Sequence, residues 1–404
     1  MSNLVGKNNK KSSDARTHQL NSAFKTMKII KTTYFVFLFV LLFSFNEQVY
    51  SQQQSYQYLS TWPQFDSARV KDLAFRIENA NFFRNDEYTS PIVDGYTLIG
   101  LWGRFLMEYY PAENLRVRFG GHFLKYHGRE SIDDVESIPY YSIQYNPLPD
   151  LEIIFGNFDN SQNLGLLEML YEPEFYYTRK PPGGLQVRFQ RHRLHLESWI
   201  NWETHIFAGD PFQEVFTNGS LISYDLIKKE RHKLSVPLQF IYHHQGGEID
   251  STDAQIETLM NGASGLKYNY KKGDWSLGVS AWYLGYREAT SNNLQVYSSG
   301  HAGLARIIGG YKRSVLSIGY WNGNRFISPK GRKIYQSYSF SNPGKLYPRR
   351  QLLEGRMAMQ IPVKYGVTFA IEGDVYYDLR EADLSYCWGI HLMFSESFFL
   401  KNFK

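Results

Sequence analysis

The feature that most restricts the fold of this chain is an alternation of apolar and polar side chains with a period of two residues. One segment shows it clearly, because its apolar residues occupy every second position: Trp275, Leu277, Val279, Ala281 and Tyr283. Successive side chains of a β-strand point to opposite faces, so such a segment has one apolar face and one face of small or polar residues. The same pattern runs through 234–242, 367–375 and 384–394. The alternation therefore predicts an all-β protein.

A long apolar run departs from this pattern near the N-terminus. Residues 34–45 form the run, and Lys28 and Lys31 give the segment before it a positive charge. The run is shorter than the roughly 17–25 residues that a membrane-spanning helix needs. Its length and its basic flank are typical of a secretory signal peptide. An uncleaved N-terminal anchor is the alternative.

The small residues Val49 and Ser51 hold the −3 and −1 positions of a cleavage site, and Gln52 follows them. We therefore expect export, with cleavage near Ser51/Gln52. The expected organisation is an extension at 1–26 that is not translated or is disordered, a cleavable signal peptide at 27–51, a periplasmic segment at 52–70 and a barrel at 71–404.

The charge of the chain is concentrated in the part that we expect to be removed. Residues 1–51 hold seven Lys or Arg and two acidic residues, and they account for the whole net charge of +5. The remaining chain is neutral, so its charge gives no reason to expect a nucleic-acid partner. The lone cysteine, Cys387, has no second thiol in the chain with which it could form a disulfide.

The alternating segments come in pairs joined by short polar turns, and longer connections separate one pair from the next. The turns lie near 111–114, 146–150, 191–193, 229–233, 270–274, 311–314 and 363–366. This layout is typical of a closed antiparallel transmembrane β-barrel with short periplasmic turns and long extracellular loops. We expect about sixteen strands, within a range of 14–18. Aromatic residues make up 17% of the chain, which suits interfacial girdles, whereas a soluble β-sandwich, the alternative, would expose charge on one face.

The last strand carries a further signal. The sequence from Cys387 to Phe394 (CWGIHLMF) resembles the insertion signal of outer-membrane barrels, with a glycine and then alternating hydrophobic residues that end in an aromatic. Over 52–404 the chain resembles porin-like outer-membrane β-barrel proteins of Bacteroidota-type bacteria. This resemblance implies an outer-membrane location and a barrel fold, and it implies no particular substrate.

The apolar stripe of each strand fixes which side chains would face a water-filled lumen. An Arg or Lys that faced lipid at mid-membrane would cost about 2–4 kcal/mol, so charged residues should turn inward. The expected lumenal residues are Arg116, Arg118, His122, Arg188, His195, Glu197 and Arg356, together with Gln186, Gln190, Glu354 and Gln360.

The connection at 158–183 is long and acidic, and it stands where porins carry a loop that narrows the pore. It contributes Asp159, Glu168, Glu172 and Glu174. We expect these acids to face Arg188, Arg116 and Arg118 and to form a charged constriction that sets selectivity. A solvated outer loop is the alternative.

Enzymatic patterns receive little support from the sequence. His192 and His195 are three residues apart and would face opposite sides of a strand, which disfavours a shared metal. No spacing isolates a catalytic set, and no glycine-rich phosphate loop is present. We therefore expect no enzymatic activity, no catalytic residue, no metal site and no cofactor.

The sequence thus favours a porin-like channel for passive diffusion of small polar solutes. One alternative is a structural or interaction barrel that uses 322–350 as an outward contact surface, and a third is a barrel-embedded hydrolase acting on lipid or peptide. The expected partners are outer-membrane lipid and lipopolysaccharide, the barrel assembly machinery and small polar solutes. A homo-oligomer is left open.

Overall fold

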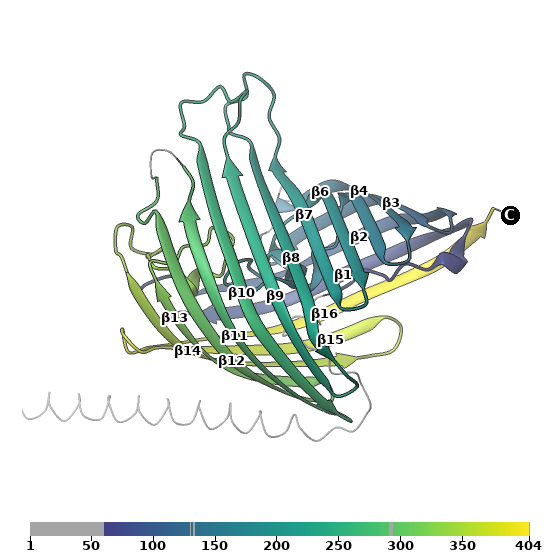
Figure 1. Ribbon diagram of the computed structural model, residues 1–404. Coiled ribbons are helices and arrows are strands. Elements are labelled where there is room, and N and C mark those ends of the chain that lie inside the picture. Colours follow the sequence, from purple (N-terminus) through teal and green to yellow (C-terminus); the bar gives the residue numbers. More distant parts are fainter. Residues whose placement is uncertain (1–59, 130, 132–133, 291–293, 404) are drawn as a thin grey trace, which may run out of the picture. The chain divides into compact units, whose positions relative to one another are not determined.

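The computed structural model describes residues 60–129, 131, 134–290 and 294–403, which form a closed barrel of sixteen antiparallel strands (Figure 1). The predicted extension, the signal peptide and its cleavage site lie outside the described residues. The barrel confirms the predicted fold class, and sixteen is the strand number expected from the turns. Among the described residues, no helix has the length and apolar character to cross a membrane.

The strands follow one another around the ring in chain order. They are β1 Asp72–Glu87, β2 Tyr96–Ala112, β3 Leu115–Tyr126, β4 Glu136–Leu148, β5 Leu151–Asn157, β6 Gly183–Arg191, β7 Leu194–Thr204, β8 Val215–Lys228, β9 His232–Gln245, β10 Glu257–Lys272, β11 Trp275–Glu288, β12 Ser299–Tyr311, β13 Ser314–Asn324, β14 Arg349–Pro362, β15 Val367–Asp378 and β16 Asp383–Asn402. The first strand pairs with the last and closes the barrel, with Asp72 opposite Asn402 and Glu87 opposite Tyr386.

The two-residue alternation becomes the two faces of the wall. Outward positions such as Leu277 on β11 and Ile318 on β13 are exposed, and Ile318 keeps 63% of its surface accessible. Inward positions such as Glu78 and Arg84 on β1 are buried. Lipid can cover the apolar outward side chains, but it offers no partner to the charged inward ones. The alternation therefore decides which face of every strand points to the lipid.

Pro237 interrupts the pairing of β9 in a manner that follows from its chemistry. Proline has no backbone N–H to donate to a neighbouring strand. The pairing of β9 with β10 runs to Leu238 opposite Ser264 and resumes at Ser235 opposite Lys267. The strand is nevertheless continuous, because Pro237 still lies opposite Ser223 of β8.

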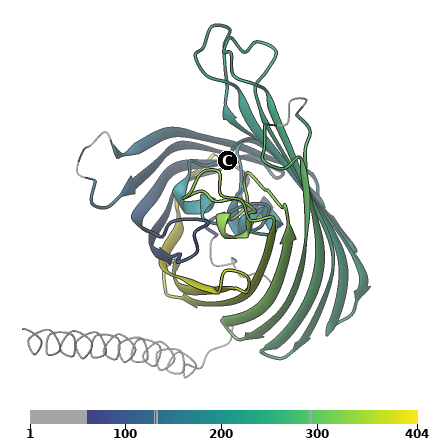
Figure 2. The ribbon, with the colours of Figure 1, turned by 90° about the vertical axis from the view of Figure 1, so that its left-hand side faces the viewer.

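Two connections fold into the ring of strands, which Figure 2 shows from a view turned by 90°. The first joins β5 to β6 and contains the short helices η3 (Ser161–Gly165) and α2 (Phe175–Thr178). The second joins β13 to β14 and contains η4 (Lys333–Tyr335). A fourth short helix, η1 (Ser67–Arg69), precedes β1.

Candidate functional site

The connection between β5 and β6, residues 158–182, is buried inside the barrel and not spread over its outer rim. Its apolar side chains Leu164, Met169 and Leu170 are almost completely buried. The backbone N–H of Leu167 donates to Oε1 of Gln239 on β9 at 2.9 Å, which ties the loop to the wall. We call this segment the first inserted loop, and its position agrees with the sequence-based expectation for 158–183.

Each of the four predicted acids of this loop contacts a guanidinium group. Asp159 Oδ2 lies 2.8 Å from Nη2 of Arg188 on β6. Glu168 contacts Arg306 on β12 at 2.7 Å and Arg356 on β14 at 2.5 Å. Buried ion pairs therefore hold the loop against the wall on two sides of the lumen. Removing either partner of such a pair would leave an uncompensated buried charge.

The other two acids contact the connection between β13 and β14 and the first strand. Glu172 contacts Arg332 at 3.0 Å, and Arg332 belongs to the connection between β13 and β14. Glu174 lies 3.4 Å from Nε of Arg84 on β1 and accepts a hydrogen bond of 2.8 Å from Tyr96. Burial raises the pKa of Glu174 to about 8, and the opposing effect of Arg84 is smaller.

The prediction that Arg116 and Arg118 face the acids of the first inserted loop is wrong. Both side chains are buried in the lumen, as their place on β3 requires, but they do not meet the acidic loop. Arg118 lies 3.4 Å from Glu78 on β1, and Arg116 lies 3.7 Å from Glu108 on β2. Acidic residues on β1 and β2 are closer than the loop, so the charges of the wall neutralise one another here.

The segment before β1 also enters the lumen and covers these arginines. The ring of Trp62 lies 3.7 Å from the guanidinium carbon of Arg118, which is a cation–π contact. Arg116 donates to the carbonyl oxygen of Pro63 at 3.3 Å. Nearby, Nδ1 of His122 accepts from Arg104 at 3.2 Å, so His122 belongs to a packed structural cluster.

The connection at 325–348 corrects the expectation of an outward contact surface at 322–350. Its residues Phe326, Ile327 and Tyr335 are buried. Lys330 lies 2.7 Å from Glu203 on β7, and Tyr335 donates to Glu354 on β14 at 2.5 Å. We call it the second inserted loop. Its apolar residues, interspersed with Lys and Arg in the sequence, were a signal against a solvated loop.

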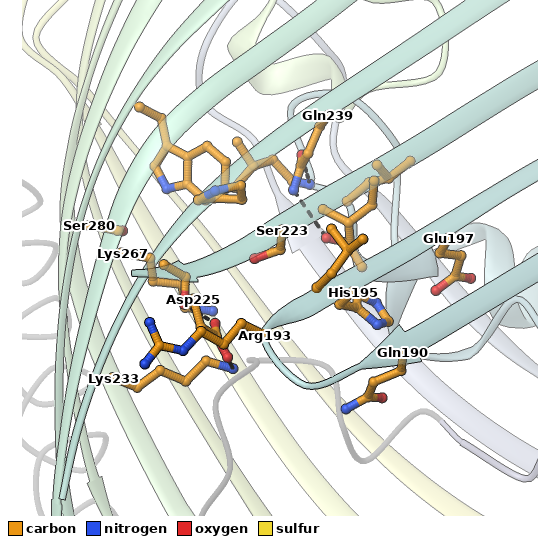
Figure 3. Close-up of a pocket in the computed structure, with 18 of the residues that line it drawn as sticks. Gln190, Arg193, His195, Glu197, Ser223, Asp225, Lys233, Gln239, Lys267 and Ser280 are labelled. Atoms are coloured by element: carbon orange, nitrogen blue, oxygen red, sulfur yellow. Dashed lines mark hydrogen bonds and ion pairs between the residues drawn. The ribbon is translucent and has the colours of Figure 1, made fainter. Parts of the chain in front are cut away.

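A cavity of about 510 Å³ remains between the first inserted loop and the inner wall of β6 to β12 (Figure 3). Arg188, His195 and Glu197, all predicted to face the lumen, line it. The turn residues His192 and Arg193 also line it, so the cavity reaches the end of the barrel that carries the short turns.

Arg356 lies outside this cavity and joins the ion-pair network around the second inserted loop. Its Nε is 2.5 Å from Oδ1 of Asp374 on β15. In the described part of the chain, no group of three or more His, Cys, Asp or Glu side chains is arranged to hold a metal ion.

Two neighbouring histidines on β9 meet hydroxyl groups on opposite faces of the wall. Inside, Nδ1 of His243 lies 3.1 Å from Oγ1 of Thr217, and Thr217 donates to Glu203 at 2.6 Å. This hydroxyl is fully buried. Its proton is already directed to a carboxylate, so the inner pair is poorly arranged for chemistry on a substrate.

The outer pair lies at the rim that carries the long loops. Nδ1 of His244 lies 2.8 Å from Oγ1 of Thr258 on β10. Among the described residues, the His244 side chain has no other hydrogen-bond partner. A base within 2.6–3.2 Å of a hydroxyl is the geometry that activates an oxygen nucleophile.

Aromatic rings surround this outer pair on the lipid-facing side. The His244 ring stacks on Tyr242, with centroids 6.0 Å apart, and lies 5.1 Å from Phe216 on β8. Phe216 in turn stacks on Trp202, which is 43% exposed. Consecutive strand residues face opposite sides, so His243 and His244 cannot serve one site together.

Comparisons with known proteins agree with the barrel fold. The structure of OccK2 (OpdF) of Pseudomonas aeruginosa in complex with glucuronate matches with a TM-score of 0.50 and 11% identity, over 82% of this chain and 98% of that one. OpdK of the same organism matches with 0.49 and 10%, over 81% and 100%. A loop-deletion mutant of OmpT of Vibrio cholerae matches with 0.47 and 10%, over 80% and 99%.

A family model described as Lipid A 3'-O-deacylase-type matches residues 65–403. The match covers all sixteen strands of the barrel. No curated protein matches the chain. Because this family carries the name of an enzyme, the match overturns the expectation that the chain has no enzymatic activity.

Proposed function

Because this chain belongs to the lipid A 3'-O-deacylase-type family, we propose that it is an outer-membrane hydrolase that removes an ester-linked acyl chain from lipid A. The single observation that carries the proposal is the His244–Thr258 pair, an imidazole and a hydroxyl 2.8 Å apart on the lipid-facing side of the extracellular rim. Lipid A occupies the outer leaflet, so its esters can reach this rim by lateral diffusion.

The lumen is a poor place for such a substrate. Both inserted loops occupy much of it, and their charged side chains are already paired with the wall. An acyl chain would have to displace this packing, whereas the outer rim already meets hydrocarbon. The aromatic neighbours Phe216 and Tyr242 suit the border between lipid and water, where such rings are enriched.

The proposed reaction has two steps in which His244 moves the proton. With its own proton on Nε2, the imidazole accepts the Thr258 hydroxyl proton on Nδ1 while Oγ1 attacks the acyl carbonyl carbon. The ester bond breaks, and the departing sugar oxygen takes that proton. Water, deprotonated by His244, then attacks the acyl-Thr258 ester, which releases the fatty acid and restores the hydroxyl.

Release of fatty acid from purified lipid A, followed by mass spectrometry, tests the proposal. We expect His244→Ala and Thr258→Val to lower the rate by at least about a hundredfold, the lower range for loss of a general base. Both side chains face outward, away from the packed lumen, so we expect the variants to fold. Heat-modifiable gel mobility checks folding separately.

The matched control is His232→Ala. Nδ1 of His232 lies 2.7 Å from the hydroxyl of Tyr268, but this pair is at the opposite end of β9, near the short turns. We expect the control variant to keep the wild-type rate. Fatty-acid release that persists in both rim variants, or that is absent from the wild type, refutes the proposal.

A second candidate function is passive passage of small polar solutes, which the cavity near the short turns and the charged lumen favour. Current through single barrels in a planar bilayer tests it, for the wild type and for a variant in which a short glycine linker replaces 159–182. Current through the wild type supports passage. Current through the variant alone assigns the first inserted loop as a plug and refutes passage.

A further inference from the structure

We propose that the cavity shown in Figure 3 binds a small, hydroxyl-rich anion that carries one carboxylate or phosphate group. This inference goes beyond the deacylase proposal. The cavity opens toward the short turns, whereas the His244–Thr258 pair lies on the outer surface near the long loops. A ligand of this cavity would therefore come from the periplasm.

The charges that line the cavity are unequal. Its acids are Asp159, Glu168, Glu197 and Asp225, and its lysines and arginines are Arg188, Arg193, Lys228, Lys233, Lys267 and Arg306. Each of the four acids already has a cationic partner, since Arg188 contacts Asp159 and Glu197, Arg306 contacts Glu168, and Lys233 contacts Asp225. The remaining cations give the cavity a net positive charge.

Three lining cations have no carboxylate within ion-pair distance among the described residues. Arg193 donates to the carbonyl oxygen of Leu226 at 3.2 Å, and Lys228 donates to that of His192 at 2.6 Å. Lys267 has neither an ion pair nor a hydrogen bond in the part of the chain that the structure describes. An ammonium without a partner in a cavity shared with other cations is an electrostatic cost that a bound anion would remove.

Lys267 is also well placed to meet a ligand. It lies on the inner face of β10, opposite Ser235 of β9 and Ser280 of β11. Figure 3 shows Lys267 on the same side of the cavity as Lys233 and Arg193, with His195 and Glu197 across from them. An anionic group that enters from the turns therefore meets several cations before it reaches the first inserted loop.

The rest of the lining suits hydroxyl groups and one apolar ring face. The hydroxyls of Ser223 and Ser280 line the cavity without a hydrogen-bond partner among the described residues, and the Gln190 amide adds a donor and an acceptor. Trp282 and Leu221 supply apolar surface. A volume of about 510 Å³ fits a ligand of the size of a monosaccharide acid or phosphate.

Calorimetric titration of the purified barrel in neutral detergent tests this inference, with gluconate and glucose 6-phosphate as anionic probes and glucose as the neutral probe. We expect at least one anion to bind at low salt and to bind more weakly in 0.5 M NaCl, because ions screen the attraction. Glucose should bind at least about tenfold more weakly.

Variants at Lys267 decide whether this cavity is the site. Lys267→Gln should weaken binding of the anion at least about tenfold, and Lys267→Arg should keep most of the affinity. The matched control is Lys272→Gln, which removes an exposed lysine of the same strand outside the cavity and should change nothing. The inference is overturned if neither anion binds, if glucose binds equally well, or if Lys267→Gln binds as the wild type does.

The outcome is independent of the proposed deacylase activity. A barrel that binds the anion and releases no fatty acid would refute the proposed deacylase activity and support the anion site in the cavity. A barrel with His244→Ala should bind the anion with unchanged affinity, since His244 lies on the opposite face of the wall.

Discussion

Arg332 of the second inserted loop lies 2.9 Å from Asp374 of β15, and both side chains are buried in the lumen. Asp374 also contacts Arg84 of β1 at 3.4 Å and Arg356 of β14 at 2.5 Å. One carboxylate therefore links three guanidinium groups from a loop and two strands. The loop and the wall share a single charge network, so a change in one should be felt in the other.

We expect Asp374→Asn to lower the free energy of unfolding by about 3–5 kcal/mol, because it leaves three buried cations without their common counter-charge. Arg332→Gln should cost a similar amount, since it leaves the partly buried Glu172 without its cation although Asp374 keeps two partners. Equilibrium unfolding in urea, with the barrel in lipid vesicles, measures both. The control is Arg129→Gln, whose exposed pair with Asp134 should contribute at most about 1 kcal/mol. Equal costs for Asp374→Asn and the control would contradict the network.

The docking of the first inserted loop should depend on pH through Glu174. Its pKa in the docked loop is raised to about 8 from an ordinary value of 4.5. The docked carboxyl thus holds a proton that the released loop has lost, so docking weakens as the pH rises from about 4.5 to 8 and is constant outside that window. The slope is at most about 1.4 kcal/mol per pH unit.

Trypsin cleavage after Arg179, whose guanidinium packs on the Phe175 ring in the docked loop, reports the released state. We expect cleavage of the wild type, relative to Glu174→Gln at the same pH, to increase between pH 6 and pH 9. The glutamine variant cannot ionise and corrects for the pH dependence of the protease. A constant ratio across this range would mean that Glu174 does not titrate in the docked loop.

The segment before β1 should depend on Trp62 for its place in the lumen. The contact of Trp62 with Arg118 is worth about 1–2 kcal/mol when shielded from water. Thr61→Cys introduces a reporter thiol at a position of this segment that is only 4% exposed, and the native Cys387 is buried in the wall and should react slowly. Adding Trp62→Ala should speed labelling of that thiol by a maleimide roughly five- to thirtyfold. An unchanged rate would show that the segment is held elsewhere.

Lipid contact of the outer face can be tested at Ile318. Because this side chain points outward from β13, Ile318→Arg should cost about 2–4 kcal/mol if the site lies near the middle of the bilayer. Folding yield into lipid vesicles measures the effect. Tyr365→Arg is the control, since Tyr365 is exposed in the turn between β14 and β15 and should tolerate the charge. Equal yields for both variants would argue against lipid contact at Ile318.

For the candidate sites, the sequence predicted the direction of the side chains but not their partners. The inward direction of Arg188, His195 and Glu197 followed from the sequence, because an apolar stripe on one face assigns the other face to the lumen. Their ion pairs did not follow from it. Nor did the His244–Thr258 pair, which exists because β9 and β10 pair in a register that sets these two residues opposite each other.

By itself the sequence determined the barrel, its turns and the face to which each strand residue points, because alternation is local and lipid penalises every exception to it. The tertiary structure decided between an inserted and a solvated arrangement of the first inserted loop, and it alone turned the second inserted loop inward and selected the partners of Arg116 and Arg118. Loops carry no periodic pattern, and a lumen rich in both signs of charge offers many pairings. Closure of the ring brings strands far apart in sequence together, and that proximity selects among them.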